Sequence, residues 1–264
     1  MADFNVSNFV IDHVLSGAMI DTKYDTIMWQ INQITDPALN VSSETSEAVD
    51  ALGTPIATFN RSKKSEFSAS NALFDLGLFA AQNGVEKKVA SASAKVVVPM
   101  FEAIVVPAST ATPVSLKHTP LKTPQAIYQL KGDGTLGEKL VYNSGAGAGK
   151  FTYATGQITF PTDAKAGAEY FVQYEYEAER AVAVTGDAMN YPRAGKFVME
   201  VLGTDVCDPS TLIHAYIVFP NAKLDANVDI TFSTDGKHPF KLIAQQAYCD
   251  KQKTLFSIVI PDEE

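Results

Sequence analysis

Long apolar stretches and cysteines are both scarce in this sequence of 264 residues. The longest uninterrupted apolar runs, such as Val96–Val98 and Ile217–Phe219, fall far short of the ~20 residues that a membrane-spanning helix needs. The first residues, Met1–Phe4, are not a basic segment followed by an apolar one, so we expect no signal peptide. Without export, two buried thiols are the favoured state of Cys207 and Cys249, with a disulfide as the alternative.

Basic side chains are in deficit as well, because 21 Lys and Arg stand against 30 Asp and Glu, for a formal net charge of -9. Proteins that hold nucleic acid through its phosphates need clustered Lys and Arg, so this balance argues against such a function. Charged residues make up only 19% of the chain, below the ~25% of an average globular protein, which suggests a surface partly covered by another protein. The hydrophobic share of 46% is enough for a real core in one large or two small domains.

Sequence signatures of catalysis are missing too, including the Gly-x-Ser-x-Gly turn of many hydrolases. The glycine-rich segment Ser144–Lys150 departs from a phosphate-binding loop, because Ser144 takes the first glycine position and Phe151 follows the lysine. A carboxylate pair for glycoside hydrolysis stays open, since 30 acidic residues offer many pairs. We expect no enzyme, no cofactor and no metal site. The histidines lack the spacing of metal ligands: His13, His118, His214 and His238.

What the sequence does contain is a β pattern, which dominates after residue 95. In Tyr170–Ala178, tyrosines alternate with glutamates, which predicts a half-buried strand with a charged outer side. The predicted strands after residue 95 are Val96–Val106, Ala126–Leu130, Lys139–Tyr142, Lys150–Thr155, Gln157–Phe160, Glu169–Ala183, Lys196–Leu202, Leu212–Phe219, Asn227–Phe232, Phe240–Ala247 and Thr254–Ile260. The sequence therefore predicts a mainly β protein.

One helix accompanies these strands. Its capping candidates are Ser68–Asn71, its apolar positions run from Ala72 to Ala80, and Asn83–Gly84 is its stop. Two earlier segments, Thr26–Ile31 and Ala57–Arg61, are predicted strands. The helix is expected to flank the β-structure.

We expect three parts along the chain. Residues 1–106 hold an N-terminal arm, a long loop, a strand and the helix, and residues 188–264 form a further sheet. Residues 107–187 are a β-rich module, a candidate insertion that begins with the Pro-, Ser- and Thr-rich connector Pro107–Thr123. The long loop is predicted at Ala38–Thr54, which is rich in Ser, Glu, Asp and Ala and lacks strong periodicity.

Three groups of segments resemble the tail tube proteins of tailed bacteriophages and together cover most of residues 53–260. The first is a strand followed by the helix, the second a hairpin module and the third a closing sheet. The segments are Gly53–Ser68 with the helix to Gly84, then Gly134–Leu136, Tyr153–Phe160 and Val172–Tyr176, and finally Ile217–Leu224 and Asp235–Phe240.

The resemblance implies a β-sandwich or barrel flanked by one helix, with residues 107–187 in the tube wall or as an outer decoration. It implies a virion structural subunit, made in the bacterial cytoplasm, that closes into hexameric rings and stacks into a tube for DNA ejection. Its partners are then copies of itself and other tail proteins: a tape measure, a sheath or baseplate protein and a terminator. DNA passes without specific binding, in keeping with the net charge of -9. No membrane is involved.

Subunit contacts are expected at Trp29, Phe59 and Arg61, because aromatic and arginine side chains commonly anchor interfaces. Glu44 and Glu47 join them, since they lie in the predicted loop and segments that order on binding can wrap a neighbour. For each residue, a place in the core or on the free surface is the alternative. Two other functions stay open: another virion protein, such as a capsid decoration or baseplate component, and a non-catalytic β-sandwich binding module.

Overall fold

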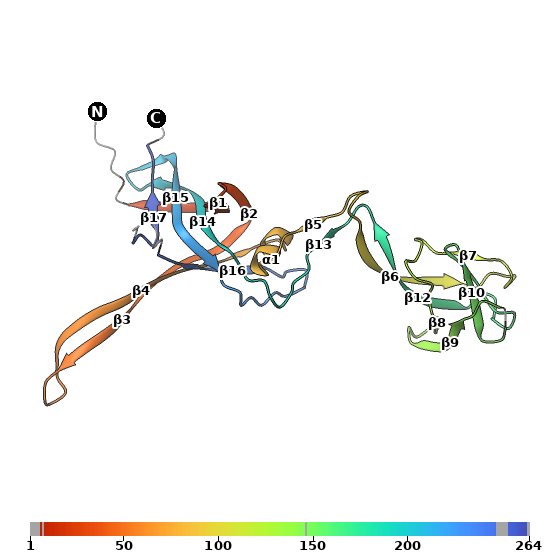
Figure 1. Cartoon of the computed structure of the whole chain (residues 1–264). Helices are drawn as coiled ribbons and strands as arrows, with labels where there is room; N and C mark the ends of the chain where they lie inside the picture. The colour runs from red at the N-terminus through yellow and green to blue at the C-terminus, as the bar shows by residue number, and fades with distance from the viewer. Residues whose placement is uncertain (1–5, 7, 146, 247–252, 263–264) are drawn as a thin grey trace. The chain divides into compact units, whose positions relative to one another are not determined.

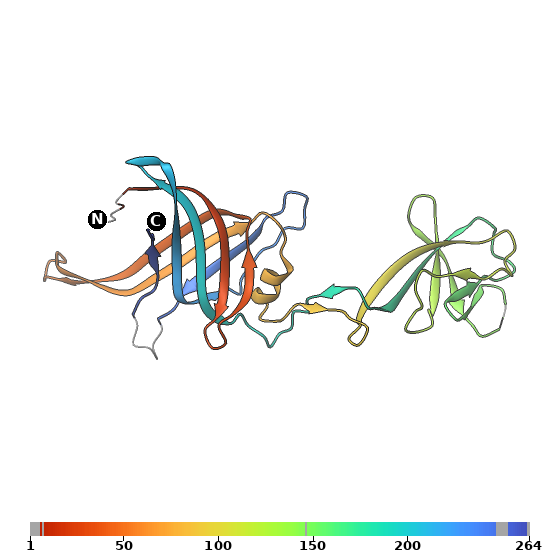
Figure 2. The same cartoon turned by 90° about the horizontal axis from the view of Figure 1, so that it is seen from above.

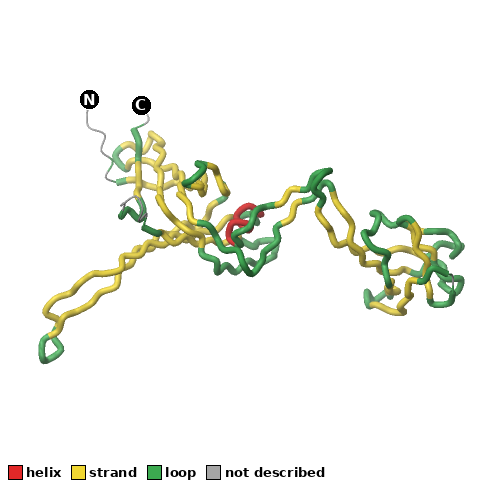
Figure 3. The backbone as a smooth tube through the Cα atoms, viewed as in Figure 1, coloured by secondary structure: helices red, strands yellow, loops and turns green. Residues whose placement is uncertain are grey.

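A computed structural model of the chain describes residues 6, 8–145, 147–246 and 253–262 (Figure 1). Its elements form two compact units. Unit 1 combines Met1–Lys87 with Val184–Glu264, and unit 2 is Lys88–Ala183. Strands dominate both units, and the described residues contain a single short helix (Figure 3). The protein is therefore mainly β, as the sequence predicted.

Unit 1 is built on one sheet with the strand order β2-β1-β14-β15-β16-β4-β3, to which β17 adds by pairing with β15. All these pairings are antiparallel, and the sheet curls into a nearly closed, barrel-like form (Figure 2). The strands are β1 (Phe9–Asp21), β2 (Thr26–Ile31), β3 (Ile34–Val49), β4 (Pro55–Asn71), β14 (Ala194–Asp205), β15 (Asp208–Leu224), β16 (His238–Ala244) and β17 (Ser257–Val259).

An aromatic cluster forms the centre of the core of unit 1. Phe197 of β14 is fully buried, and its ring centroid lies 5.7 Å from that of Trp29 and 5.8 Å from that of Phe67. Phe219 and Phe240 lie 6.2 and 6.5 Å from Phe197. Buried residues alternate with more exposed ones along β14, so the register of this strand decides which side chains reach the core. The cluster joins strands from both ends of the chain.

The helix, α1 (Leu76–Gln82), begins later than the sequence predicted. Its N-cap is Asp75, whose side chain accepts a hydrogen bond of 2.7 Å from a backbone amide of the first turn. The predicted cap, Ser68–Asn71, is instead the end of β4, because its backbone pairs with β16. The predicted stop is confirmed, since Asn83 is the C-cap and Gly84 has a φ of +67°.

His238 of β16 lies against this helix and is only 1% exposed. Its Nδ1 accepts a hydrogen bond of 3.2 Å from the Asp75 amide, and its Nε2 lies 2.8 Å from Gln82 Oε1. This geometry fits a neutral imidazole that carries its proton on Nε2 and donates it to the amide oxygen. Burial lowers the pKa of His238 from its usual 6.5, and the nearby Asp75 carboxylate opposes that shift without cancelling it.

We expect the free energy of unfolding of unit 1 to fall as the pH drops below 6.5, because the unfolded chain then binds a proton that folded His238 excludes. A His238→Asn variant keeps an acceptor for the Asp75 amide but cannot titrate, so its stability should depend less on pH over the same range. Denaturant unfolding followed by the fluorescence of Trp29, at about pH 7.5 and about pH 5.5, measures both proteins. An equal pH dependence of stability in the wild-type protein and the variant would contradict the assignment of this effect to His238.

Unit 2 contains a seven-stranded sheet of order β6-β12-β8-β9-β10-β11-β7 and a two-stranded ribbon of β5 and β13. Its core includes Ile127, Phe151 and Ile158, each with 0% exposure. The alternation predicted for Tyr170–Ala178 is confirmed, since Tyr174 is buried while Glu175 and Glu177 are exposed. The strands are β5 (Lys88–Val89), β6 (Val96–Val105), β7 (Val114–Ser115), β8 (Ala126–Leu130), β9 (Leu136–Tyr142), β10 (Lys150–Ala154), β11 (Gln157–Thr159), β12 (Glu169–Ala178) and β13 (Val182–Ala183).

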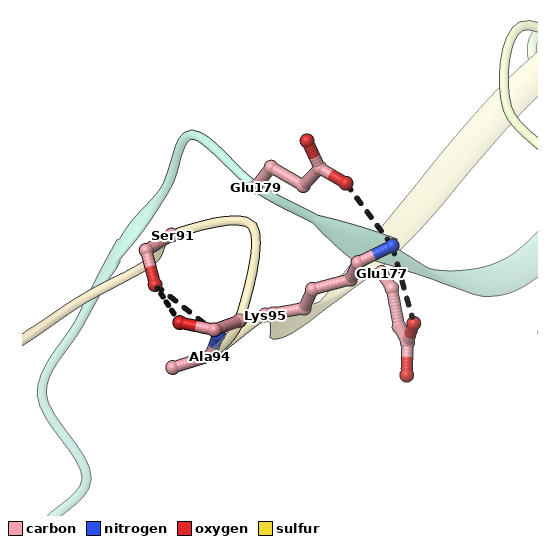
Figure 4. Close-up of polar contacts among 6 residues, drawn as sticks. Ser91, Ala94, Lys95, Glu177 and Glu179 are labelled. Carbon is pink, nitrogen blue, oxygen red and sulfur yellow. Dashed lines mark hydrogen bonds and ion pairs between the residues drawn. The ribbon is translucent and has the colours of Figure 1, made fainter.

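A turn and an ion-pair cluster mark the passage from the ribbon to the large sheet of unit 2 (Figure 4). The Ser91 hydroxyl accepts a hydrogen bond of 3.1 Å from the Ala94 amide, which closes the turn before β6. The next residue, Lys95, places its Nζ 3.1 Å from a carboxylate oxygen of Glu179 and 4.0 Å from one of Glu177. These contacts tie the start of β6 to the end of β12.

Two segments differ from the sequence expectation. Ala38–Thr54 is not a long loop, because all but its last few residues belong to β3, which pairs with β4 almost from end to end. Asn227–Phe232 carries no strand. Unit 2 also begins earlier than the predicted module of residues 107–187, since β6 pairs with β12 over all of its 10 residues.

The expectation of two buried thiols is wrong for Cys207. This residue follows the end of β14 and is exposed, with its amide donating a hydrogen bond of 2.9 Å to the Asp205 carboxylate. Cys249 lies outside the described residues.

Candidate assembly interface

A long two-stranded hairpin, formed by β3 and β4, extends from the sheet of unit 1 (Figure 1). Beyond the pair of Val41 with Ser65, β3 and β4 are paired only with each other among the described strands. Every residue from 41 to 64 is exposed, and we call this segment the arm. Since the arm has no core of its own, its shape depends on cross-strand pairing and on the turn at its tip.

The turn at the tip of the arm is stabilised by the side-chain carboxylate of Asp50. Asp50 Oδ1 accepts hydrogen bonds of 2.9 Å from the Leu52 amide and 2.8 Å from the Thr54 amide. Gly53 takes a φ of +83°, a conformation that other residues rarely adopt. Leu52 is 92% exposed at this tip, although removal of a leucine side chain from water is energetically favourable. A preformed turn that presents a bare leucine is suited to contact another protein.

Four of the five predicted contact residues lie together on the arm. Glu44 and Arg61 form one directly opposed pair, and Glu47 pairs with Thr58. Phe59, which is 51% exposed, is two residues from Arg61 and therefore shares its face of the ribbon. Glu47 lies on the other face, because its partner Thr58 is adjacent to Phe59 in the strand. Both faces of the arm thus offer side chains to a partner.

The fifth predicted contact residue, Trp29, does not lie on the arm. Its side chain is 4% exposed and packs on Phe197 and Phe240 in the core of unit 1. The burial follows from the alternation of β2, in which Trp29 and Ile31 point inward. A side chain in this position stabilises the fold and is not available as a surface anchor.

The sheet of unit 1 also has two open ends, β2 and β3. Along β2, a cavity of about 590 Å³ lies between the strand and α1, with Ile27, Met28 and Val85 among its lining residues. Ile27 is 63% exposed there. Unpaired strand edges present free backbone donors and acceptors, so they are natural sites for a second chain to add. Sequence patterns missed this feature, because only the strand order shows which strands are terminal.

The comparison with known families covers most of this architecture. The chain matches the model of the YomU/Tube protein family over residues 9–254. It belongs to the YomU/Tube protein family. No curated protein matches the chain. The match includes the arm, the whole of unit 2 and all but the last strand of unit 1.

The YomU/Tube family is phage-associated and tube-like, which makes this chain a phage structural protein of the tube type and a component of the virion. Proteins of such a family are generally not enzymes. In the described part of the chain, no helix is long and apolar enough to span a membrane. Among the same residues, no three His, Cys, Asp or Glu side chains converge as metal ligands.

Proposed function

We propose that this YomU/Tube protein is the subunit of a bacteriophage tail tube, which closes into hexameric rings that stack around a channel for DNA ejection. The observation that carries the proposal is the arm, whose residues 41–64 are all exposed on a protein of a tube family. An extended hairpin without a core of its own is stabilised when another copy covers it. Stacking of rings supplies that cover.

Ring closure would use the two open ends of the unit 1 sheet. A contact between β2 of one subunit and β3 of the next is heterologous, and such contacts generate rings when the rotation closes. Joining the sheets in this way also removes the unpaired edges that otherwise invite aggregation. The net charge of -9 favours a lumen that does not retain DNA phosphates.

Within the virion, the rings would contact the other tail components: a tape measure, a sheath or baseplate protein and a terminator. DNA would pass through without specific binding. The interface residues Glu44, Glu47, Phe59 and Arg61 would lie between successive copies, because all four are on the arm.

Negative-stain electron microscopy of the purified protein, with light scattering of the same sample during size exclusion, tests the proposal. We expect rings or tubes of uniform diameter, with a smallest assembly that is six times the 28.4 kDa chain. Only monomers across the accessible concentration range would instead favour a capsid decoration or a baseplate component.

A further inference from the structure

The edge strand of the large sheet in unit 2 exposes an apolar face. β6 is the first strand in the sheet order and, among the described strands, pairs only with β12. Phe101 is 59% exposed, and Val97 and Val105 are 50% exposed. The outward-facing residues of β6 are all apolar: Val97, Pro99, Phe101, Ala103 and Val105. On this face, β6 therefore contributes no charged side chain that water could solvate.

Aromatic rings on the neighbouring strands widen this face. Phe171 of β12 is opposite Ala103, and its ring stacks on Phe101 at 5.6 Å with an interplanar angle of 17°. Tyr128 of β8 is opposite Phe171 and only partly buried. We call the outward residues of β6, together with Phe171 and Tyr128, the apolar strip. Soluble proteins seldom leave such a patch uncovered, so the strip is suited to bind a partner.

Carboxylates border the apolar strip on β12. Glu169 is opposite Val105, Glu175 is opposite Pro99, and neither carboxylate has a cation partner among the described residues. Two copies that met through the same strip would bring these like charges together, which disfavours a symmetric contact. Pro99 also lacks an amide proton, so β6 is a poor edge for strand addition. The strip therefore fits an apolar segment with cationic side chains, laid on its face.

The arm carries a segment with this composition. Residues 55–64 expose Ile56 by 71% and Phe59 by 51%, and they contain three cations and no carboxylate. Among the described contacts, Lys64 pairs with Glu44 at 3.1 Å, whereas Arg61 and Lys63 lack an ion pair. We infer that the apolar strip of one copy binds residues 55–64 in the arm of a second copy. This inference rests on the proposed function, because it requires copies of the chain to meet.

A photo-crosslinking residue placed at position 101 of the full chain identifies the occupant of the strip. After irradiation of the assembled protein, mass spectrometry should find intermolecular adducts with peptides that contain residues 55–64. The matched control has the same photoreactive group at Val182, which is 48% exposed and lies in β13 of the two-stranded ribbon, outside the large sheet that carries the strip. We expect at least about fivefold fewer arm adducts from that position, as follows from a contact confined to one patch.

Charge reversal tests the same contact independently. Glu175→Lys and Arg61→Glu should each raise the protein concentration needed for assembly by about fivefold, and the double variant should restore it to within about twofold. The control is Glu138→Lys, an exposed carboxylate beside Lys139, whose side chain shares the face of Tyr128. Since neighbouring residues of a strand alternate, Glu138 lies on the opposite face, and its reversal should leave assembly unchanged.

The outcomes separate this inference from the proposed function. Tubes that form with adducts from position 101 only to other segments, or to another unit 2, overturn the inference and leave the tube function standing. Arm adducts in a protein that forms dimers but never rings overturn the tube function and support the inference. A protein that never associates gives no intermolecular adduct, which overturns both. Single and double charge variants that assemble alike also contradict the inference.

Discussion

Removal of the arm is expected to abolish tube assembly while unit 1 stays folded. In the shortened variant, a tight Gly-containing turn replaces residues 42–63 and connects Val41 to Lys64. The deleted residues are all exposed and pair only within the arm, so the core of unit 1 loses no contact. Assembly loses the apolar surface of Leu52, Ile56 and Phe59, which is worth about 1.5–3 kcal/mol for each side chain that a partner fully buries.

Electron microscopy and sedimentation of the wild-type and shortened proteins measure this effect, with circular dichroism to check the fold. A graded comparison uses Phe59→Ser on the arm and Leu136→Ser in unit 2, whose native side chains are 51% and 52% exposed. We expect the first to weaken assembly and the second to leave it unchanged. Tubes of normal length from the shortened protein would show that the arm does not mediate stacking.

Truncation of Phe197 is expected to have the largest effect on stability. Phe197→Ala should lower the free energy of unfolding of unit 1 by about 3–5 kcal/mol, because it opens a cavity in the packed core. The ring is 0% exposed and lies within 6.5 Å of the rings of Trp29, Phe67, Phe219 and Phe240. Little space is available for the surrounding strands to collapse into the void without changing their register.

The single tryptophan makes this measurement specific for unit 1. Trp29 is the only Trp of the chain and lies 5.7 Å from Phe197, so its fluorescence in a denaturant titration follows unit 1 alone. The matched control is Phe59→Ala, which removes a ring of the same size from the exposed arm and should change stability by about 0.5 kcal/mol or less. A loss below about 1 kcal/mol in Phe197→Ala would mean that this core is looser than its burial indicates.

Part of the fold could be predicted from local patterns because local physics determines it. The tyrosines and glutamates of β12 alternate with the period of a strand, and the observed burial follows that period. Asn83 and Gly84 end α1 where expected, since Gly84 has a positive φ and faces the backbone of Tyr191 so closely that a side chain would collide with it. Strand β2 likewise has the bounds that its apolar residues indicate.

Other elements could not be predicted, because their structure depends on pairing partners that are distant in sequence. Ala38–Thr54 lacks alternation, since most of it pairs in an arm without a core, and only β4 makes it a strand. Ser68–Asn71 has the composition of a helix cap, but pairing with β16 draws it into β4, and Asp75 takes the capping role. The exposure of Cys207 follows from its position just after the end of β14.

By itself, the sequence determined the β class, the helix, the acidic net charge and the resemblance to tube proteins, because each of these depends on composition or on patterns of short range. The tertiary structure alone decided which predicted contact residues are available: it buried Trp29 in the core and placed Glu44, Glu47, Phe59 and Arg61 on one exposed arm. The physical reason is that burial and strand pairing depend on residues far apart in sequence, such as Trp29 and Phe197, which only the folded sheet brings into contact.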